Sequence, residues 1–132
     1  MTLTIDGLLT TARNTYDRVS PYRAHREAEK GAVIVDVRPD WQREVEIPGS
    51  LIIERNHLEW RVHPDSDARL PAADTTKRWI LLCSEGYASS LAAASLVQLG
   101  LDATDIVGGI AAWQEAGLPV VSGPTDVGRF VG

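Results

Sequence analysis

The chain has 132 residues, of which 44% are hydrophobic and 23% charged, a composition typical of a single folded domain whose core needs no disulfides. Its net charge of −5 argues against nucleic acid or an anionic membrane surface as the main partner. The sequence has no basic and apolar leader and no run of about 18 apolar residues, so we expect a cytoplasmic protein without membrane segments.

Two helices are predicted near the start of the chain. Apolar positions at helical spacing predict the first over residues 5–16. A second, polar helix is predicted over residues 21–30, because Ser20 is a typical N-cap and Pro21 suits the first helical position. Residues 1–19 are interpreted as an N-terminal extension that packs either on its own domain or on a neighbour.

Short apolar runs alternate with helical segments in the rest of the chain. Strands are predicted at residues 32–37, 51–53, 79–82 and 104–107. Helices or helical turns are predicted within residues 40–45, 54–62, 90–99 and 110–116, with loops between them and a loosely packed tail from residue 121. This alternation is typical of βαβ units, so the expected class is α/β with a parallel sheet.

The only cysteine, Cys83, stands between a buried strand and a helix. It follows the apolar run 79–82, and the turn residues 84–86 indicate that it ends this strand. The helix that follows runs to Leu99 and stops at Gly100. The N–H groups of the turn and the helix dipole would favour a thiolate there, so Cys83 is a candidate nucleophile. An inert core thiol is the alternative, because cysteine is often buried.

A series of motifs in a fixed order resembles a single-domain rhodanese. The motifs are Val35-Asp36-Val37-Arg38, Ile47-Pro48-Gly49-Ser50, Cys83-x-x-Gly86-x-x-Ser89, Val107-Gly108-Gly109-x-x-Ala112-Trp113 and Gly117-Leu118-Pro119-Val120. The resemblance implies a rhodanese-like fold, with a five-stranded, mostly parallel sheet and helices on both faces. It also implies a domain over residues 20–121 and a C-terminal tail over residues 122–132.

The resemblance further implies a sulfurtransferase. Cys83 matches the catalytic cysteine, which accepts a sulfane sulfur from thiosulfate or a persulfide donor and passes it to a thiol or protein acceptor. The loop that matches the family's persulfide cradle comprises Ser84, Glu85, Gly86, Tyr87, Ala88 and Ser89. Backbone N–H donors at a helix N-terminus stabilise such an anion without a general base. No cofactor is implied, and the histidines and the cysteine lack metal-ligand spacing.

Three residues depart from the family's usual pattern. Ala88 stands where the loop often has arginine, Glu85 adds a negative charge, and Glu46 replaces a common histidine. Like charges disfavour an anionic donor, so a persulfide donor is at least as good a candidate as thiosulfate. Arg55 follows a strand end on the same edge of the sheet and could supply the missing positive charge. The alternative is an exposed arginine paired with a neighbouring glutamate.

Three further residues have weaker or structural assignments. Asp36 and Arg38 flank the end of a predicted strand, resemble the family's Asp-x-Arg, and are expected to orient the site rather than to react. His57 is a weaker candidate than Arg55 for binding substrate.

Two other functions stay open at this point. The chain could be a weakly active or non-catalytic rhodanese module that binds a partner or relays sulfur or a redox signal. It could also be a cysteine-dependent phosphatase or arsenate reductase of the same fold. The six-residue loop and its missing arginine disfavour the latter, because the related phosphatases have a longer loop. The sequence does not indicate an oligomeric state.

Overall fold

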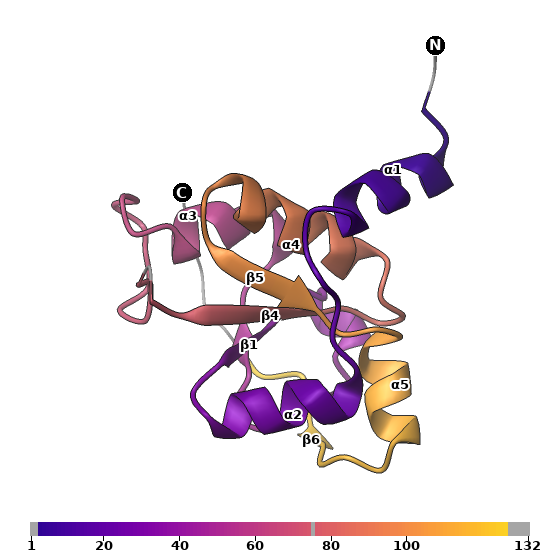
Figure 1. The fold of residues 1–132 in the computed structure, drawn as a ribbon. Coiled ribbons are helices and arrows are strands. Elements are labelled where there is room, and N and C mark those ends of the chain that lie inside the picture. The colour runs from indigo at the N-terminus through magenta and orange to yellow at the C-terminus, as the bar shows by residue number, and fades with distance from the viewer. Residues whose placement is uncertain (1–2, 75, 127–132) are drawn as a thin grey trace.

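The structure is a computed structural model and describes residues 3–74 and 76–126 (Figure 1). Four parallel strands form the central sheet in the order β3 (Leu51–Ile52), β1 (Val33–Asp36), β4 (Arg78–Leu82) and β5 (Asp102–Asp105). Helices α2 (Pro21–Glu29) and α5 (Gly109–Glu115) cover one face. On the other face lie α1 (Ile5–Arg13), α3 (Leu58–Val62) and α4 (Ala88–Gln98). Two 3-10 turns, Asp40–Gln42 and Arg55–His57, and an antiparallel ribbon of β2 (Val45–Glu46) with β6 (Val121–Ser122) complete the fold.

The central strand β4 divides the core into two halves, because side chains along a strand alternate between the faces of its sheet. Trp79 and Leu81 pack among residues of α3 and α4, in a cluster that also contains Cys83. Ile80 and Leu82 point to the opposite face and pack against α2 and α5. All four of these β4 side chains are fully buried, which explains why this segment is apolar throughout.

The predicted α/β class with helices on both faces is confirmed, but the sheet has four strands rather than five. A single parallel bridge between Val19 and Ile106 lies beyond β5. The chain cannot extend that bridge into a strand because Ser20 accepts a hydrogen bond from Arg23 N at 3.1 Å and so begins α2.

Two local predictions were wrong. The predicted helix over residues 40–45 is a single 3-10 turn followed by strand β2. The tail from residue 121 is not loose at its start, because Val121 and Ser122 pair with β2, and Thr125 is hydrogen-bonded to buried Glu46. The domain limits 20–121 and 122–132 stay a prediction, and residues 127–132 of the tail lie outside the described part of the chain.

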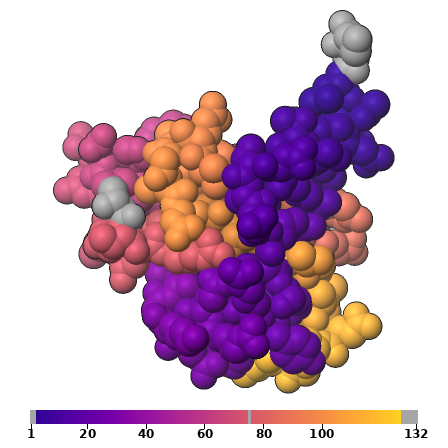
Figure 2. Space-filling view, in the orientation of Figure 1, coloured from indigo at the N-terminus to yellow at the C-terminus, as the bar shows by residue number. Residues whose placement is uncertain are grey.

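Helix α1 projects from the domain and touches it mainly through α4 (Figures 1 and 2). Thr4 caps it by accepting a hydrogen bond from Gly7 N at 2.9 Å, and it ends at Arg13 rather than at residue 16. Leu9 and Ala12 are its buried residues. The N-terminal extension therefore packs on its own domain.

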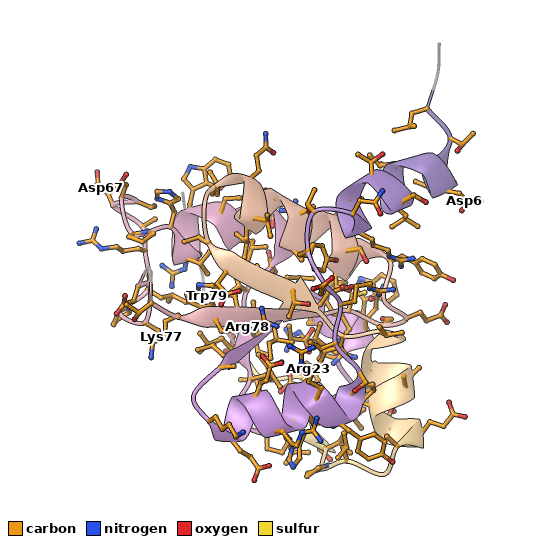
Figure 3. The ribbon with its side chains drawn as sticks, viewed as in Figure 1. Asp6, Arg23, Asp67, Lys77, Arg78 and Trp79 are labelled. Atoms are coloured by element: carbon orange, nitrogen blue, oxygen red, sulfur yellow. The ribbon has the colours of Figure 1, made fainter. Side chains whose placement is uncertain are left out.

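At the amino end of the sheet, ion pairs connect β4 to α2 and to β5. Arg78 at the start of β4 donates to Glu27 on α2 at 2.6 Å and to Asp102 on β5 at 2.8 Å, and Arg23 also donates to Glu27. Figure 3 labels the two arginines. The hydrogen bond from Arg78 lowers the pKa of Glu27. The opposite, carboxyl edge carries Cys83, which is where α/β sheets bind ligands. Within the described residues, no helix is long and apolar enough to cross a bilayer.

Candidate active site

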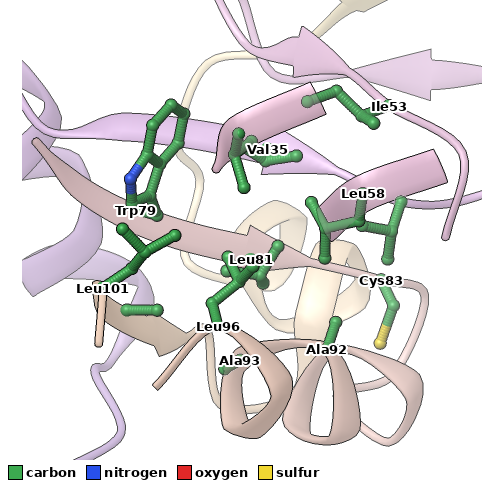
Figure 4. Close-up of a cluster of buried hydrophobic side chains, with 13 residues drawn as sticks. Val35, Ile53, Leu58, Trp79, Leu81, Cys83, Ala92, Ala93, Leu96 and Leu101 are labelled. Atoms are coloured by element: carbon green, nitrogen blue, oxygen red, sulfur yellow. The ribbon is translucent and has the colours of Figure 1, made fainter. Parts of the chain in front are cut away.

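Cys83 lies at the carboxyl end of β4, within the apolar cluster that includes Leu58 and Ala92 (Figure 4). The residue is 6% exposed. The sulfur accepts hydrogen bonds from Gly86 N at 3.1 Å and from Ser89 N at 3.3 Å. The thiol in turn donates to Ser89 Oγ at 3.2 Å. The structure thus wraps the predicted loop 84–89 around the sulfur, and two of its amides already face it.

Helix α5 binds the carbonyl groups of Cys83 and of Ser84, the first residue of the loop. Cys83 O accepts from Ile110 N at 2.9 Å and Ser84 O accepts from Ala111 N at 3.2 Å. In a trans peptide the C=O and the following N–H point in opposite directions. Anchoring these carbonyls on α5 therefore turns the N–H groups of Ser84 and Glu85 toward the opposite, inner side of the loop.

Gly86 has no room for a side chain. Its φ of +91° is a conformation that suits glycine, and a Cβ there would lie 2.9 Å from Gly108 N and 3.0 Å from Arg18 Nη2. The tight curl of the loop at this position depends on the missing side chain. Glu85, Tyr87 and Ala88 are exposed and form the outer rim.

A buried carboxylate, Asp105 at the end of β5, supports the loop from behind. It accepts hydrogen bonds from the hydroxyls of Ser89 at 2.7 Å and Ser90 at 2.9 Å, and from Tyr16 at 2.7 Å. Arg18 forms a two-pronged ion pair with it at 2.9 and 3.0 Å. Burial opposes the charge of Asp105, but the bonds from Arg18, Ser89 and Tyr16 outweigh it and lower the pKa of this carboxyl.

The effect on Tyr16 has the opposite sign. Burial and the nearby charge of Asp105 raise the pKa of Tyr16, so it stays a neutral hydrogen-bond donor. Ser89 links the carboxylate to the sulfur, because its hydroxyl donates to Asp105 while it accepts from the Cys83 thiol.

Asp36 and Arg38 form a buried ion pair at 2.7 Å beside the loop. Arg38 also donates to Gln42 O at 2.7 Å and Val45 O at 2.8 Å, which fixes the segment that follows β1. The side chain of Gln42 accepts from Ser84 Oγ at 2.9 Å. The pair is thus connected to the loop through Gln42, and its expected role in orienting the site stays a prediction.

The hydrogen bonds of Arg55 connect it to Glu59 and not to the cysteine loop. It donates to both carboxylate oxygens of Glu59 at 3.0 Å, which is the alternative that the sequence left open. Burial opposes the charge of Glu59, but Ser95 and Arg55 outweigh it and lower its pKa. His57 lies 4.0 Å from Glu54. A role for Arg55 in substrate binding stays a prediction.

Glu46 lies in the ribbon rather than at the loop. It is buried, forms an ion pair with Arg43 and accepts hydrogen bonds from Thr125. These partners outweigh the effect of burial and lower its pKa. The glutamate that replaces the family's histidine is therefore part of the packing of β2 against the C-terminal segment.

Sequence reasoning missed Arg13, Tyr16, Arg18 and Asp105. The first three lie in the N-terminal extension, which carries no recognisable motif of its own. Asp105 did carry a signal, since an acidic residue inside a buried apolar strand needs hydrogen-bond partners. Over the described ranges, 3–74 and 76–126, no group of three or more His, Cys, Asp or Glu residues could hold a metal ion.

The site is a thiol at the end of the central parallel strand, enclosed by six loop residues that precede a helix. This combination of fold and site defines the class of protein to which the chain belongs. The model of the rhodanese-like domain family matches residues 20–116, and the chain belongs to this family.

Among its relatives are two proteins named thiosulfate sulfurtransferase GlpE. The one from Stutzerimonas stutzeri is 36% identical over 101 residues, which is 75% of this chain and 85% of the relative. The one from Pseudomonas syringae is 34% identical over 103 residues, which is 75% of this chain and 88% of the relative.

Two solved structures extend the comparison. A rhodanese-related protein from Thermoplasma volcanium is 28% identical, with a TM-score of 0.66, and covers 80% of this chain and 98% of its own. A Rhodopseudomonas palustris protein of unknown function, named as a possible tyrosine phosphatase, is 31% identical with a TM-score of 0.82. It covers 92% of this chain and 96% of its own, so about 11 of 132 residues (8%) stay unmatched. Because 19 residues precede the family match, that structure includes part of the N-terminal extension.

Proposed function

We propose that the protein is a sulfurtransferase that carries sulfur on Cys83 as a persulfide. The observation that carries the proposal is the pair of hydrogen bonds from Gly86 N and Ser89 N to Sγ, by which two amides of the loop converge on the sulfur. An anion bound there is stabilised by preorganised N–H donors and by the N-terminus of α4. Names of relatives at 31–36% identity support the same class of reaction.

The loading step is a displacement at sulfur. The Cys83 thiolate attacks the outer sulfur of the donor, forming an Sγ–S bond while the donor's S–S bond breaks. With thiosulfate, sulfite leaves with the electron pair of the broken bond. With a persulfide donor, the donor thiolate leaves. The charge that arrives on the outer sulfur of Cys83 then lies within reach of the loop amides.

The unloading step reverses these roles. A thiolate acceptor attacks the outer sulfur, the new S–S bond forms on the acceptor, and the Cys83 thiolate leaves with the electron pair. No net oxidation or reduction occurs over the cycle, so no cofactor is needed. A small thiol or a protein thiol can act as the acceptor in this scheme. Cyanide can also take the outer sulfur, in which case a C–S bond forms, thiocyanate is released and the Cys83 thiolate again leaves with the electron pair.

The rim of the loop favours a donor with little negative charge. Glu85 is exposed on the rim, and the loop itself has no arginine or lysine. Thiosulfate carries two negative charges on its reacting group, whereas the persulfide group of a protein or a small donor carries one. We therefore propose a protein or low-molecular persulfide as the preferred donor, with thiosulfate as a slower one.

Intact-mass measurement tests the proposal. The protein is incubated with thiosulfate or with glutathione persulfide, and we expect one added sulfur that cyanide removes. Cys83→Ser is the matched control and should gain none. If no donor adds a sulfur to the wild-type protein, the enzyme proposal fails, and a non-catalytic module for partner binding becomes the better description.

Phosphate-ester hydrolysis is the second candidate, because the Rhodopseudomonas neighbour is named as a possible tyrosine phosphatase. The loop argues against it, since the two guanidinium groups that bond the loop, those of Arg13 and Arg18, donate to its outward Gly86 carbonyl rather than to its inner face. An aryl phosphate assay with vanadate decides the matter. Turnover that vanadate inhibits and that needs Cys83 would favour the phosphatase.

A further inference from the structure

Two arginines reach the cysteine loop from the N-terminal extension. Arg13, the last residue of α1, donates from Nη2 to Gly86 O at 2.7 Å. Arg18 donates from its own Nη2 to the same oxygen at 3.0 Å. The hydroxyl of Ser90 is a third donor to it, at 3.2 Å. One carbonyl of a loop that carries no basic residue is therefore bonded to two guanidinium groups from outside the family match.

These bonds set the orientation of the Gly86–Tyr87 peptide. Because C=O and N–H point in opposite directions across a trans peptide, a Gly86 carbonyl held outward turns Tyr87 N–H to the inner side. Helix α5 does the same for the carbonyls of Cys83 and Ser84. The loop thus has two anchors, α5 on its first half and the two arginines on its second.

The two guanidinium groups differ in how their charge is balanced. Arg18 is paired with Asp105, and although burial opposes its charge, that pairing and the nearby sulfur of Cys83 raise its pKa. The partners of Arg13 are neutral: Ser90 Oγ at 2.9 Å, Gly86 O, and the ring of Tyr87 at 6.0 Å. Together, Arg13, Arg18 and Asp105 place one net positive charge behind the loop.

We propose that Arg13 and Arg18 are positioning residues that replace the missing loop arginine from outside the loop. They hold the Gly86 carbonyl outward and so aim Tyr87 N–H at the outer sulfur of the persulfide. Their positive charge, placed behind the Gly86–Tyr87 peptide, also stabilises the negative charge on that sulfur. The inference rests on the proposed function, because the persulfide is the anion that the amide would bind. It gives the extension a part in sulfur transfer.

Arg13 is the residue to change, because Arg18 also holds buried Asp105 and its loss would disturb the core. We expect Arg13→Ala to lower kcat/KM for sulfur transfer about tenfold, since it loosens one donor of the anion site. Arg13→Lys keeps the charge but not the planar fork that bonds Ser90 and Gly86 together, so it should recover less than half of the activity. Arg26→Ala, at an exposed position on α2, removes the same charge away from the loop and should match the wild type.

Two readouts separate positioning from simple stability. A purely structural role would lower Tm but leave kcat/KM per folded molecule unchanged. A positioning role should move the backbone amide resonance of Tyr87 in Arg13→Ala while resonances of the β4 core stay in place. If Arg13→Ala equals Arg26→Ala in kcat/KM, the inference is overturned whether or not the Tyr87 resonance moves, because loss of the Arg13 contact with the Tyr87 ring moves that resonance by itself.

Failure of the proposed function leaves a different pattern. If the wild type takes up no sulfur from any donor, that function is lost, and binding of thiosulfate to the loop, followed by amide shifts, tests the inference alone. Weaker binding in Arg13→Ala than in Arg26→Ala would support it. Equal binding, or none in the wild type, would overturn it.

Discussion

Glu85 is the residue that we expect to limit the use of thiosulfate. Its carboxylate is exposed on the rim of the loop and meets a dianionic donor with a like charge. Glu85→Gln should lower KM for thiosulfate about two- to fivefold, because an exposed charge at close range is worth about 0.5–1 kcal/mol. Steady-state kinetics at low ionic strength measure this change, and added salt should reduce it.

A second glutamate serves as the control for this prediction. Glu115 is exposed at the end of α5, so Glu115→Gln changes the net charge equally without touching the rim. An equal fall in KM for both variants would mean that overall charge, and not Glu85, repels the donor. An unchanged KM in Glu85→Gln would contradict the proposed preference for persulfide donors.

At the scale of elements, α5 is the anchor of the cysteine loop, and Gly109 lets it approach. A Cβ on Gly109 would lie 2.4 Å from Cys83 O and 2.7 Å from Ser84 O, and its φ is +61°. Gly109→Ala should therefore destabilise the protein by at least about 2 kcal/mol and slow the loading of Cys83. Urea unfolding and the rate of persulfide formation measure the two effects.

Gly117, just after α5, is a control that separates the cost of backbone strain from the cost of a steric clash. Its φ is +75°, but a Cβ there would meet nothing within 4 Å. Gly117→Ala should cost about 1 kcal/mol from backbone strain alone and leave the loading rate unchanged. If the two alanine variants behaved alike, close contact between α5 and the loop would not explain the need for Gly109.

The ribbon of β2 and β6 is the second element with a clear energetic prediction. Glu46→Ala would leave Arg43, which is 2% exposed, as a buried charge without its carboxylate. We expect a loss of about 3–5 kcal/mol of unfolding free energy, measured in urea. Because Glu46 bonds the ribbon and not the loop, kcat/KM per folded molecule should stay at the wild-type value.

Neighbouring Glu44 is exposed, so Glu44→Ala should stay within about 0.5 kcal/mol of the wild type. If Glu46→Ala does not fold, the milder Glu46→Gln, which we expect to stay folded, takes its place in the test. A change in KM for thiosulfate in Glu46→Gln would contradict the placement of Glu46 away from the donor.

The sequence was informative where the site is local in the chain. Cys83 and the loop to Ser89 span seven residues between an apolar strand and an uncharged helix, so turn residues and spacing predicted their arrangement. The support behind the loop joins residues far apart, with Arg13 and Ser90 separated by 77 positions and Tyr16 and Asp105 by 89. No periodicity spans such distances.

Short pairings were missed for a related reason. The β2 and β6 strands have two residues each, and each strand is held by the other rather than by its own pattern. For Arg55 the local sequence suggested a contact that the structure does not show. Its position after a strand end suggested a place at the site, but its side chain pairs with Glu59 on the next helix.

At the scale of the whole molecule, Asp105 joins the sheet, the cysteine loop and the N-terminal extension. Its pKa is lowered in the folded protein from a usual value of 3.8. A carboxyl with a lowered folded pKa stabilises the fold above its unfolded pKa, and this stabilisation is lost as the pH falls through the folded value. Glu46 and Glu59 have lowered pKa values too, so unfolding free energy should decline as the pH falls below about 4.5.

Asp105→Asn tests how much Asp105 contributes to the pH dependence of the unfolding free energy. At pH 7 it should cost about 3–5 kcal/mol, because Arg18 loses its buried counterion. The difference from the wild type should shrink as the pH falls below about 4, since the unfolded wild-type chain then takes up a proton at this carboxyl that the folded protein resists. Asp67→Asn, at an exposed loop position, should show no such convergence. Urea unfolding between pH 7 and pH 3 measures these differences, and a constant gap for Asp105→Asn across that range would show that its charge does not hold the three parts together.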